Sequence, residues 1–229
     1  MKTTSSRRRR LPREERERHI LDEAVRFFAE VGFEGQTRVL AERLGVTQPL
    51  LYRYFPDKES LIERVFEEVF RRRWQPEWSS LLQDRAIPLQ TRLAEFYQRY
   101  CHAILDPEWI RILMFAGLKG EEVTARHLKA VRTNMLEPVC VELRHEFGLP
   151  PRTVLPIDDA EIDFAWILHS AVLAIPVRKW VFQLALPDDI DALVDSTVAT
   201  FLRGSSETYR RLVGRRLAKP VMLPAELAS

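Results

Sequence analysis

The 229-residue sequence predicts an all-α protein, in which a three-helix helix-turn-helix unit near the N-terminus precedes a larger helical domain. Apolar residues recur every three or four positions along most of the chain, which is the spacing of one helix face. Glycine follows several of these runs, as at Gly32 and Gly45, and glycine is common just beyond a helix C-terminus. No stretch shows the strict alternation that favours a β-strand.

At the N-terminus three helices are predicted. The first carries its apolar face over Ile20–Val31 and ends at Gly32. A second covers about Thr37–Leu44 and a third about Thr47–Tyr54. Two short helices joined by a glycine-containing turn, here Gly45-Val46, are typical of a helix-turn-helix, which places its second helix in the major groove of DNA.

The start of the third helix carries the residues suited to contacting base edges. Thr47 is placed to cap it, and Pro49 falls at the second position, where an N–H would have no partner within the helix. The side-chain cap bond from Thr47 is therefore expected to go to Leu50. At such a tip Gln48 can pair with adenine, Arg53 with guanine, and Pro49 or Leu50 with a thymine methyl group.

A fourth helix is predicted from Asp57, its N-cap, to about Arg73. Lys58 lies in its first turn, where the helix dipole disfavours a cation by about 0.3–1 kcal/mol. A bound phosphate would reverse that sign. Tyr52 and Tyr54 bring hydroxyl groups to the same edge, although Tyr52 could instead belong to the core and Lys58 to an ordinary surface.

Five further helices are predicted, near Pro88–Leu105, Pro107–Leu118, Glu121–Phe147, Asp159–Leu186 and Asp188–Arg203. Pro150, Pro151 and Pro156 mark one loop between them. Pro176 lies inside an apolar helical run and is expected to kink it. Gly204 is expected to end the last helix.

Charge is unevenly distributed along the chain. The whole chain has a net charge of +2, but residues 1–58 hold 13 Lys and Arg against 9 Asp and Glu, so the remainder carries −2. A basic N-terminal part suits a polyanionic partner. The Arg7–Arg10 run could contact a DNA groove or remain a solvated tail.

Other classes of protein find less support. No phosphate-binding loop, nucleophile elbow or zinc motif is present, so neither an enzyme nor a cofactor is expected. Cys101 and Cys140 are expected to be buried thiols. The longest nearly apolar stretch, Ala165–Val177, is too short to span a bilayer, and no signal peptide is apparent, which predicts a cytoplasmic protein without a membrane segment.

The stretch Ile20–Val69 closely resembles the TetR/AcrR family of bacterial regulators. The resemblance lies in the motifs Phe27-Phe28-x-x-Val31-Gly32-Phe33, Leu40-Ala41-x-x-Leu44-Gly45-Val46-Thr47 and Leu51-Tyr52-x-Tyr54-Phe55-Pro56-Asp57-Lys58-x-x-Leu61. It implies that bases are contacted by Gln48, Pro49, Leu50 and Arg53, and phosphates by Thr37, Thr47, Tyr52, Tyr54 and Lys58. The sequence departs from the family pattern at two places. The connection between Phe33 and Ala41 is one residue shorter, and Leu50 stands where the family often has a small or polar residue.

The resemblance also implies a domain plan. Residues 1–12 would form a flexible basic arm, 13–57 the DNA-binding unit, 58–75 a connecting helix, 76–215 a ligand-binding and dimerisation domain, and 216–229 a tail. Such proteins are homodimers that bind near-palindromic operators. Most repress transcription and release DNA when a small-molecule inducer binds.

The last two long helices are the expected dimer interface, because their apolar faces are larger than the core of one chain is expected to need. These faces comprise Ile162, Ala165, Trp166, Leu168, His169, Val172 and Leu173, then Ile190, Leu193, Val194, Val198 and Phe201. Candidate inducer contacts, each of which could instead be a core or surface residue, are Phe96, Tyr100, Trp109, Phe115, His127, Asn134, Trp166 and His169. The alternative function is a DNA-bound structural or cell-division factor of the same fold without an inducer.

Overall fold

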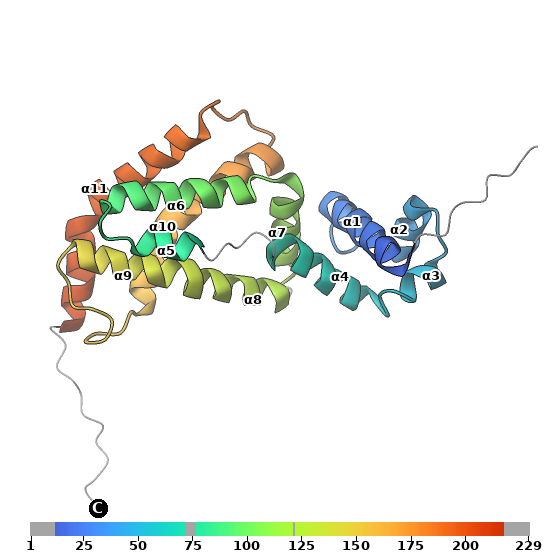
Figure 1. Ribbon diagram of the computed structural model, residues 1–229, viewed down its shortest axis with the longest axis horizontal. Coiled ribbons are helices and arrows are strands. Elements are labelled where there is room, and N and C mark those ends of the chain that lie inside the picture. The colour runs from blue at the N-terminus through green and yellow to red at the C-terminus, as the bar shows by residue number, and fades with distance from the viewer. Residues whose placement is uncertain (1–11, 72–76, 121, 218–229) are drawn as a thin grey trace, which may run out of the picture. The chain divides into compact units, whose positions relative to one another are not determined.

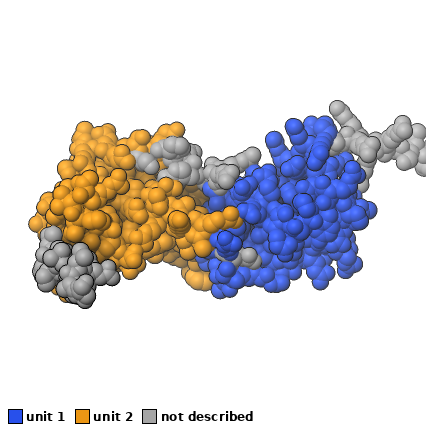
Figure 2. Space-filling view, turned by 90° about the horizontal axis from the view of Figure 1, so that it is seen from below, with its two compact units in different colours: residues 1–74, 107–124 blue, residues 75–106, 125–229 orange. Residues whose placement is uncertain are grey.

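The computed structural model describes residues 12–71, 77–120 and 122–217, and the regular elements in these ranges are all helices (Figure 1). The all-α prediction is confirmed. The chain forms two compact units (Figure 2), one from residues 1–74 and 107–124 and the other from residues 75–106 and 125–229. Segment 107–124, expected in the larger domain, thus belongs to the same unit as the helix-turn-helix. The predicted basic arm and tail lie almost wholly outside the described residues.

The first unit contains five helices and a π-helical turn among its described residues: α1 (Arg13–Val31), α2 (Thr37–Leu44), α3 (Gln48–Tyr52), α4 (Lys58–Phe66), η1 (Glu67–Arg71) and α7 (Pro107–Lys119). The predicted bounds of α2 are confirmed. The third helix is shorter than predicted because the chain turns at Arg53 and Tyr54 before Pro56, and a residue preceding proline disfavours helical geometry.

Aromatic side chains join α1 to α7 through the core of the first unit. Phe28 packs on Phe33 and Phe33 on Phe66, with ring centroids 5.4 and 5.8 Å apart. Phe70 then packs between Phe66, at 4.8 Å, and Trp109, at 5.4 Å. Helix α7 is therefore held against α1 and α4 by the same continuous core, although it lies far away in sequence.

Arg111 strengthens this junction at the C-terminus of α1. Its Nε donates to the carbonyl oxygen of Ala29 at 2.5 Å, and its Nη2 donates to that of Glu30 at 3.1 Å. The last carbonyl groups of a helix have no partner within the helix and carry the negative end of its dipole, so a guanidinium group there is stabilising.

The second unit is built from α5 (Glu77–Gln83), α6 (Leu89–Ile104), most of α8 (Glu122–Val131), η2 (Arg132–Leu136), α9 (Glu137–Glu146), α10 (Asp159–Pro176), η3 (Val177–Val181) and α11 (Ile190–Leu217). Helix α5 was not predicted from the sequence. Helix α10 passes into the π-helical turn η3 directly after Pro176, and helical structure ends at Val181 rather than at Leu186. Cys101 and Cys140 are buried and free, as predicted.

Gly204 does not end the last helix, contrary to the prediction. Helix α11 continues through it to Leu217. A glycine inside a helix costs about 1 kcal/mol relative to alanine. Beyond it, Tyr209 and Val213 are fully buried against the rest of the unit, and this burial offsets the cost.

The apolar face of α10 that the sequence assigned to a dimer is largely used within one chain. Ile162, Ala165, Leu168, His169 and Val172 are all at most 2% exposed. The same holds for Val194 and Val198 of α11. A different side of α10 stays accessible, with Ile167 59% exposed and Ala171 and Ala174 also exposed. The sequence could not show that the seven buried residues are covered within one chain, because it shows how apolar a helix is, but not which neighbour covers it. The other predicted residues stay partly exposed, namely Trp166, Leu173, Ile190, Leu193 and Phe201.

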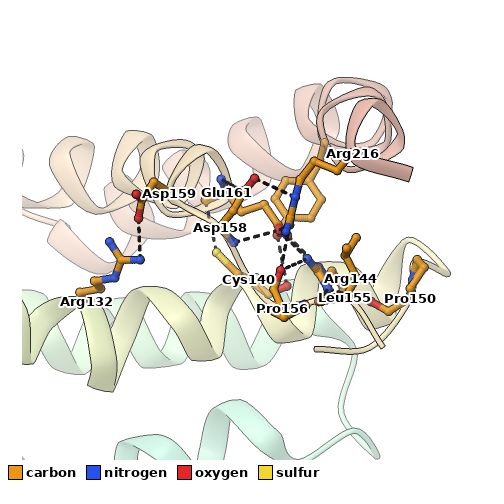
Figure 3. Close-up of polar contacts among 11 residues, drawn as sticks. Arg132, Cys140, Arg144, Pro150, Leu155, Pro156, Asp158, Asp159, Glu161 and Arg216 are labelled. Carbon is orange, nitrogen blue, oxygen red and sulfur yellow. Dashed lines mark hydrogen bonds and ion pairs between the residues drawn. The ribbon is translucent and has the colours of Figure 1, made fainter. Parts of the chain in front are cut away.

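A buried ionic network ties α9, α10 and α11 to the loop that precedes α10 (Figure 3). Arg144 and Glu161 are 1% and 0% exposed and share two hydrogen bonds, one of them from Nε to Oε2 at 2.7 Å. Arg144 also donates to the carbonyl oxygens of Pro150, at 3.0 Å, of Pro156, at 3.2 Å, and of Leu155.

The Glu161 carboxylate has further partners on α11. It accepts from the Tyr209 hydroxyl at 2.7 Å and from Arg216 at 3.1 Å. Burial raises the pKa of Glu161, but the hydrogen bonds from Arg144 and Tyr209 outweigh this effect and leave the pKa below its ordinary value. Both ions are thus charged and neutralised in the interior.

Among the described residues, one helix, Asp159–Val181, is long and apolar enough by length and composition to cross a membrane. Its mean hydropathy over the most apolar window is 1.4, and 44% of that window is buried within the protein. A core helix of a soluble protein meets the same criterion, so the helix is only a weak indication of a membrane segment.

Candidate DNA-binding site

The turn between α2 and α3 is fixed by Gly45. Its φ of 63° is left-handed, a conformation that glycine adopts without the steric cost that a side chain would add. The N–H of Gly45 donates to the carbonyl of Glu42, and that of Val46 to the carbonyl of Ala41, both at 3.0 Å. This glycine C-cap satisfies the end of α2 and directs the chain into α3.

Thr47 occupies the N-cap position of α3 with an extended backbone, and Pro49 stands in the first turn, as predicted. The expected side-chain cap is not formed. Instead the Thr47 carbonyl accepts from the N–H groups of Leu50, at 2.9 Å, and Leu51, at 3.2 Å. The Thr47 hydroxyl is left on an exposed residue at the tip of the helix.

The connection before α2 is tight because Gly35 lies directly against α1. A Cβ atom at Gly35 would lie 2.6 Å from side-chain atoms of both Phe27 and Val31. No side chain fits there without movement of these neighbours. The absence of a side chain thus lets the shortened connection bring Thr37, at the start of α2, up to α3.

Thr37, Gln48 and Tyr52 form one polar cluster between α2 and α3. The hydroxyl oxygens of Thr37 and Tyr52 are 2.8 Å apart, at hydrogen-bonding distance. Gln48 Nε2 donates to Thr37 Oγ1 at 3.0 Å and lies 3.4 Å from the Tyr52 hydroxyl. Thr37 is only 5% exposed, whereas Gln48 and Tyr52 are half-buried.

The start of α4 lies next in the chain and combines a capped N-terminus with a cation. Asp57 Oδ1 accepts from the N–H of Ser60 at 2.6 Å, which confirms its predicted role as N-cap. Hydrogen bonds from Ser60, first from its side chain and then from its N–H, hold the pKa of Asp57 below its ordinary value. Lys58 is the first residue of α4 and is half-buried.

The first unit therefore carries all nine predicted DNA contacts, on the starts of α2 and α4 and along α3. The exposed ones are Thr47, Pro49 and Arg53; the half-buried ones are Gln48, Leu50, Tyr52, Tyr54 and Lys58; Thr37 is buried. Their assignment to bases or phosphates stays a prediction.

The predicted inducer contacts are only partly brought together. Phe96 and Tyr100 of α6 share an aromatic cluster with His169 of α10 and with Trp78, which the sequence prediction did not include. Trp166 packs edge-on against His169, with ring centroids 4.9 Å apart. His127, half-buried on α8, lies close enough to His169 to influence its pKa. The remaining candidates lie elsewhere: Trp109 and Phe115 on α7 of the first unit, and Asn134 exposed on η2.

Two polar atoms in this cluster are buried without a hydrogen-bond partner among the described residues, namely Tyr97 Oη and His169 Nδ1. The other nitrogen of His169 lies 3.3 Å from the Tyr100 hydroxyl. Burial, together with the nearby His127, lowers the pKa of His169 to about 3, so its ring is neutral near pH 7. Tyr97 was not among the predicted inducer contacts, because the sequence does not show whether the hydroxyl of a tyrosine at a core position has a hydrogen-bond partner.

A family model described as "Bacterial regulatory proteins, tetR family" matches residues 20–65, which span the helix-turn-helix and the start of α4. The helix-turn-helix region of the chain is therefore similar to that of TetR-family regulators. TetR-family regulators bind DNA and are typically dimers. A search of curated proteins finds no match.

Solved structures of TetR-like regulators share the fold over most of this chain. A regulator from Rhodococcus sp. RHA1 is 20% identical with a TM-score of 0.62, covering 86% of this chain and all of its own. The fatty acid degradation regulator FadR from Bacillus halodurans is 18% identical with a TM-score of 0.61, covering 86% and 98%. A TetR-family regulator from Streptomyces coelicolor is 20% identical with a TM-score of 0.58, covering 93% and 94%.

Proposed function

We propose that the protein is a sequence-specific repressor of transcription that binds a near-palindromic operator as a homodimer and releases it when a small molecule binds. The observation that carries the DNA-binding part is the tip of α3. Gly45 and Pro49 fix its backbone, Gln48 and Arg53 can pair with bases, and Lys58 stands beside the N-terminus of α4.

The placement of Lys58 supports a phosphate contact there. The N-terminal N–H groups of α4 and the lysine ammonium group both favour an anion, whereas in the free protein the helix dipole disfavours the cation. Thr47, Tyr52 and Tyr54 offer hydroxyl groups along the same edge. On this proposal the base contacts select the sequence, while the phosphate contacts set the position of the helix on the duplex.

The unpaired buried atoms of the second unit support the inducer. Leaving a polar group buried without a partner costs about 1–3 kcal/mol, and a bound molecule with suitable hydrogen-bonding atoms would recover part of this cost. Tyr97, Tyr100 and His169 present two hydroxyl groups and a neutral imidazole within an aromatic cluster. They favour a largely apolar ligand with an uncharged polar group.

The exposed side of α10 supports a dimer through the last two long helices. Ile167 is a large apolar side chain left accessible, and the small side chains of Ala171 and Ala174 would allow another helix to approach closely. For both copies of α3 to enter successive major grooves of one operator, the dimer must hold them about 34–36 Å apart, one turn of DNA.

Selection of binding sites from random DNA tests the proposal. We expect an inverted repeat with half-sites about one helical turn apart, and weaker binding when a matching metabolite from a panel is added. Failure to enrich any sequence would refute the DNA-binding part. Enrichment that no metabolite in a broad panel changes would favour the alternative, a DNA-bound structural factor without an inducer.

A further inference from the structure

The hydroxyl groups of Thr37 and Tyr52, which lie against the Gln48 amide, influence which base Gln48 can select. A primary amide carries donors on its nitrogen and an acceptor on its oxygen, and rotation about its last bond can present either group to a base. Here the nitrogen is turned toward the protein, since Nε2 donates to Thr37 Oγ1 at 3.0 Å. The contacts within this cluster do not use the amide oxygen.

Free of DNA, the hydrogen bond between Thr37 and Tyr52 could run in either direction, because each hydroxyl can donate or accept. A phosphate removes this choice. A phosphate oxygen is unprotonated near neutral pH and can only accept a hydrogen bond. A Tyr52 hydroxyl that contacts a phosphate must therefore donate its hydrogen to it. The Tyr52 oxygen can then only accept from Thr37.

This constraint also fixes the hydrogen bond between Thr37 and Gln48. Once Thr37 donates its proton to Tyr52, its oxygen can only accept from its remaining neighbour in the cluster, which is Gln48 Nε2. Thr37 is 5% exposed and is therefore poorly placed to contact DNA itself. Its burial suits a residue that acts through others.

We propose that Thr37 and Tyr52 are positioning residues that turn the Gln48 amide oxygen toward the bases, so that Gln48 selects a base with an amino group in the major groove. This inference rests on the proposed DNA-binding function. Adenine fits best, because its N6 can donate to the amide oxygen while the second amide hydrogen donates to N7. Cytosine offers N4 alone, and guanine places O6 against the amide oxygen.

The test compares the dissociation constants of four duplexes that differ at one base pair of the selected operator. That pair is the one at which Gln48→Ala abolishes discrimination. For the unmodified protein we expect about tenfold preference for adenine over guanine at this position. Thr37→Val, nearly the same shape without the hydroxyl, should reduce the preference to within about threefold, and Thr37→Ser should restore it.

Two further variants keep the test decisive. Tyr52→Phe should also lower the adenine preference. Without the Tyr52 hydroxyl, Thr37 can donate to the Gln48 amide oxygen, and the amide can rotate so that its nitrogen faces the bases. Thr37→Val combined with Gln48→Ala should bind the four duplexes with the same ratios of dissociation constants as Gln48→Ala alone, because Thr37 acts on base selection only through Gln48. Thermal unfolding and circular dichroism establish that each variant is folded.

Other outcomes would overturn the inference. A folded Thr37→Val protein that binds all four duplexes more weakly by one common factor would make Thr37 a phosphate or packing residue. Preference for guanine in the unmodified protein would also refute it. Absence of any selected operator would instead refute the proposed function itself, so the two failures are distinguishable.

Discussion

Arg144→Met removes one half of the buried ion pair between α9 and α10. The methionine side chain is of similar length but cannot donate to Glu161 or to the carbonyl groups of the loop before α10. Leaving one buried charge without its partner costs about 3–5 kcal/mol. We expect the lower end of this range, because Tyr209 and Arg216 still contact the Glu161 carboxylate.

Urea unfolding followed by circular dichroism measures this loss, and about 3 kcal/mol should lower the thermal midpoint by about 6–12 °C. Arg216→Met is the matched control: this arginine contacts the same carboxylate but is 25% exposed, so its removal should cost about 1 kcal/mol or less. Replacing both buried ions, with Arg144→Met and Glu161→Leu, should recover much of the lost stability because no unpaired charge remains.

The effect of pH has a defined sign. In the unmodified protein the pKa of Glu161 lies below its ordinary value, so the stability it contributes is complete above the unfolded pKa and is lost as the pH falls through the folded pKa. Without Arg144, burial should raise that pKa, so acidification stabilises the variant relative to the unmodified protein. The difference in stability should therefore narrow from pH 7 to pH 4. Equal losses for Arg144→Met and Arg216→Met would refute this account of the network.

Four other substitutions probe the two units. Gly35→Ala should destabilise the first unit by about 1–3 kcal/mol, because its Cβ would lie 2.6 Å from atoms of α1; unchanged urea unfolding would contradict this crowding. Arg53→Ala should cost about 1–3 kcal/mol of binding at one base pair only, whereas Lys58→Ala should weaken all sequences alike and lower the salt dependence by about one ion, as duplex titrations at several salt concentrations would show; the reverse pattern would exchange their roles. Because the pKa of His169 is lowered to about 3 in the folded protein, only the unfolded chain binds the proton as the pH falls below about 6.5, and the folded state loses stability. Between pH 7 and pH 5 the free energy of unfolding of His169→Gln should therefore fall by about 2 kcal/mol less than that of the unmodified protein. The same pH dependence in both proteins would contradict this account of His169.

The local sequence signals determined much of the helix-turn-helix and the start of α4. Gly45, Pro49 and Asp57 each act on backbone conformation or backbone groups within one turn of their own positions, so their roles could be predicted without knowledge of the rest of the chain. The same reasoning failed at Gly204, because burial of distant side chains outweighed a local preference of about 1 kcal/mol. The expected cap by the Thr47 side chain failed for a local reason, since its carbonyl already receives the N–H of Leu50.

Tertiary structure alone decided which residues meet. Trp109 belongs to the first unit because its ring packs on Phe70, and nothing in the sequence around either residue indicates that contact. Thr37 could be predicted to lie at the start of α2, but its contact with Gln48 depends on how two helices cross. Hydrogen bonds and burial are properties of neighbours in space, whereas spacing, capping and composition report only neighbours along the chain.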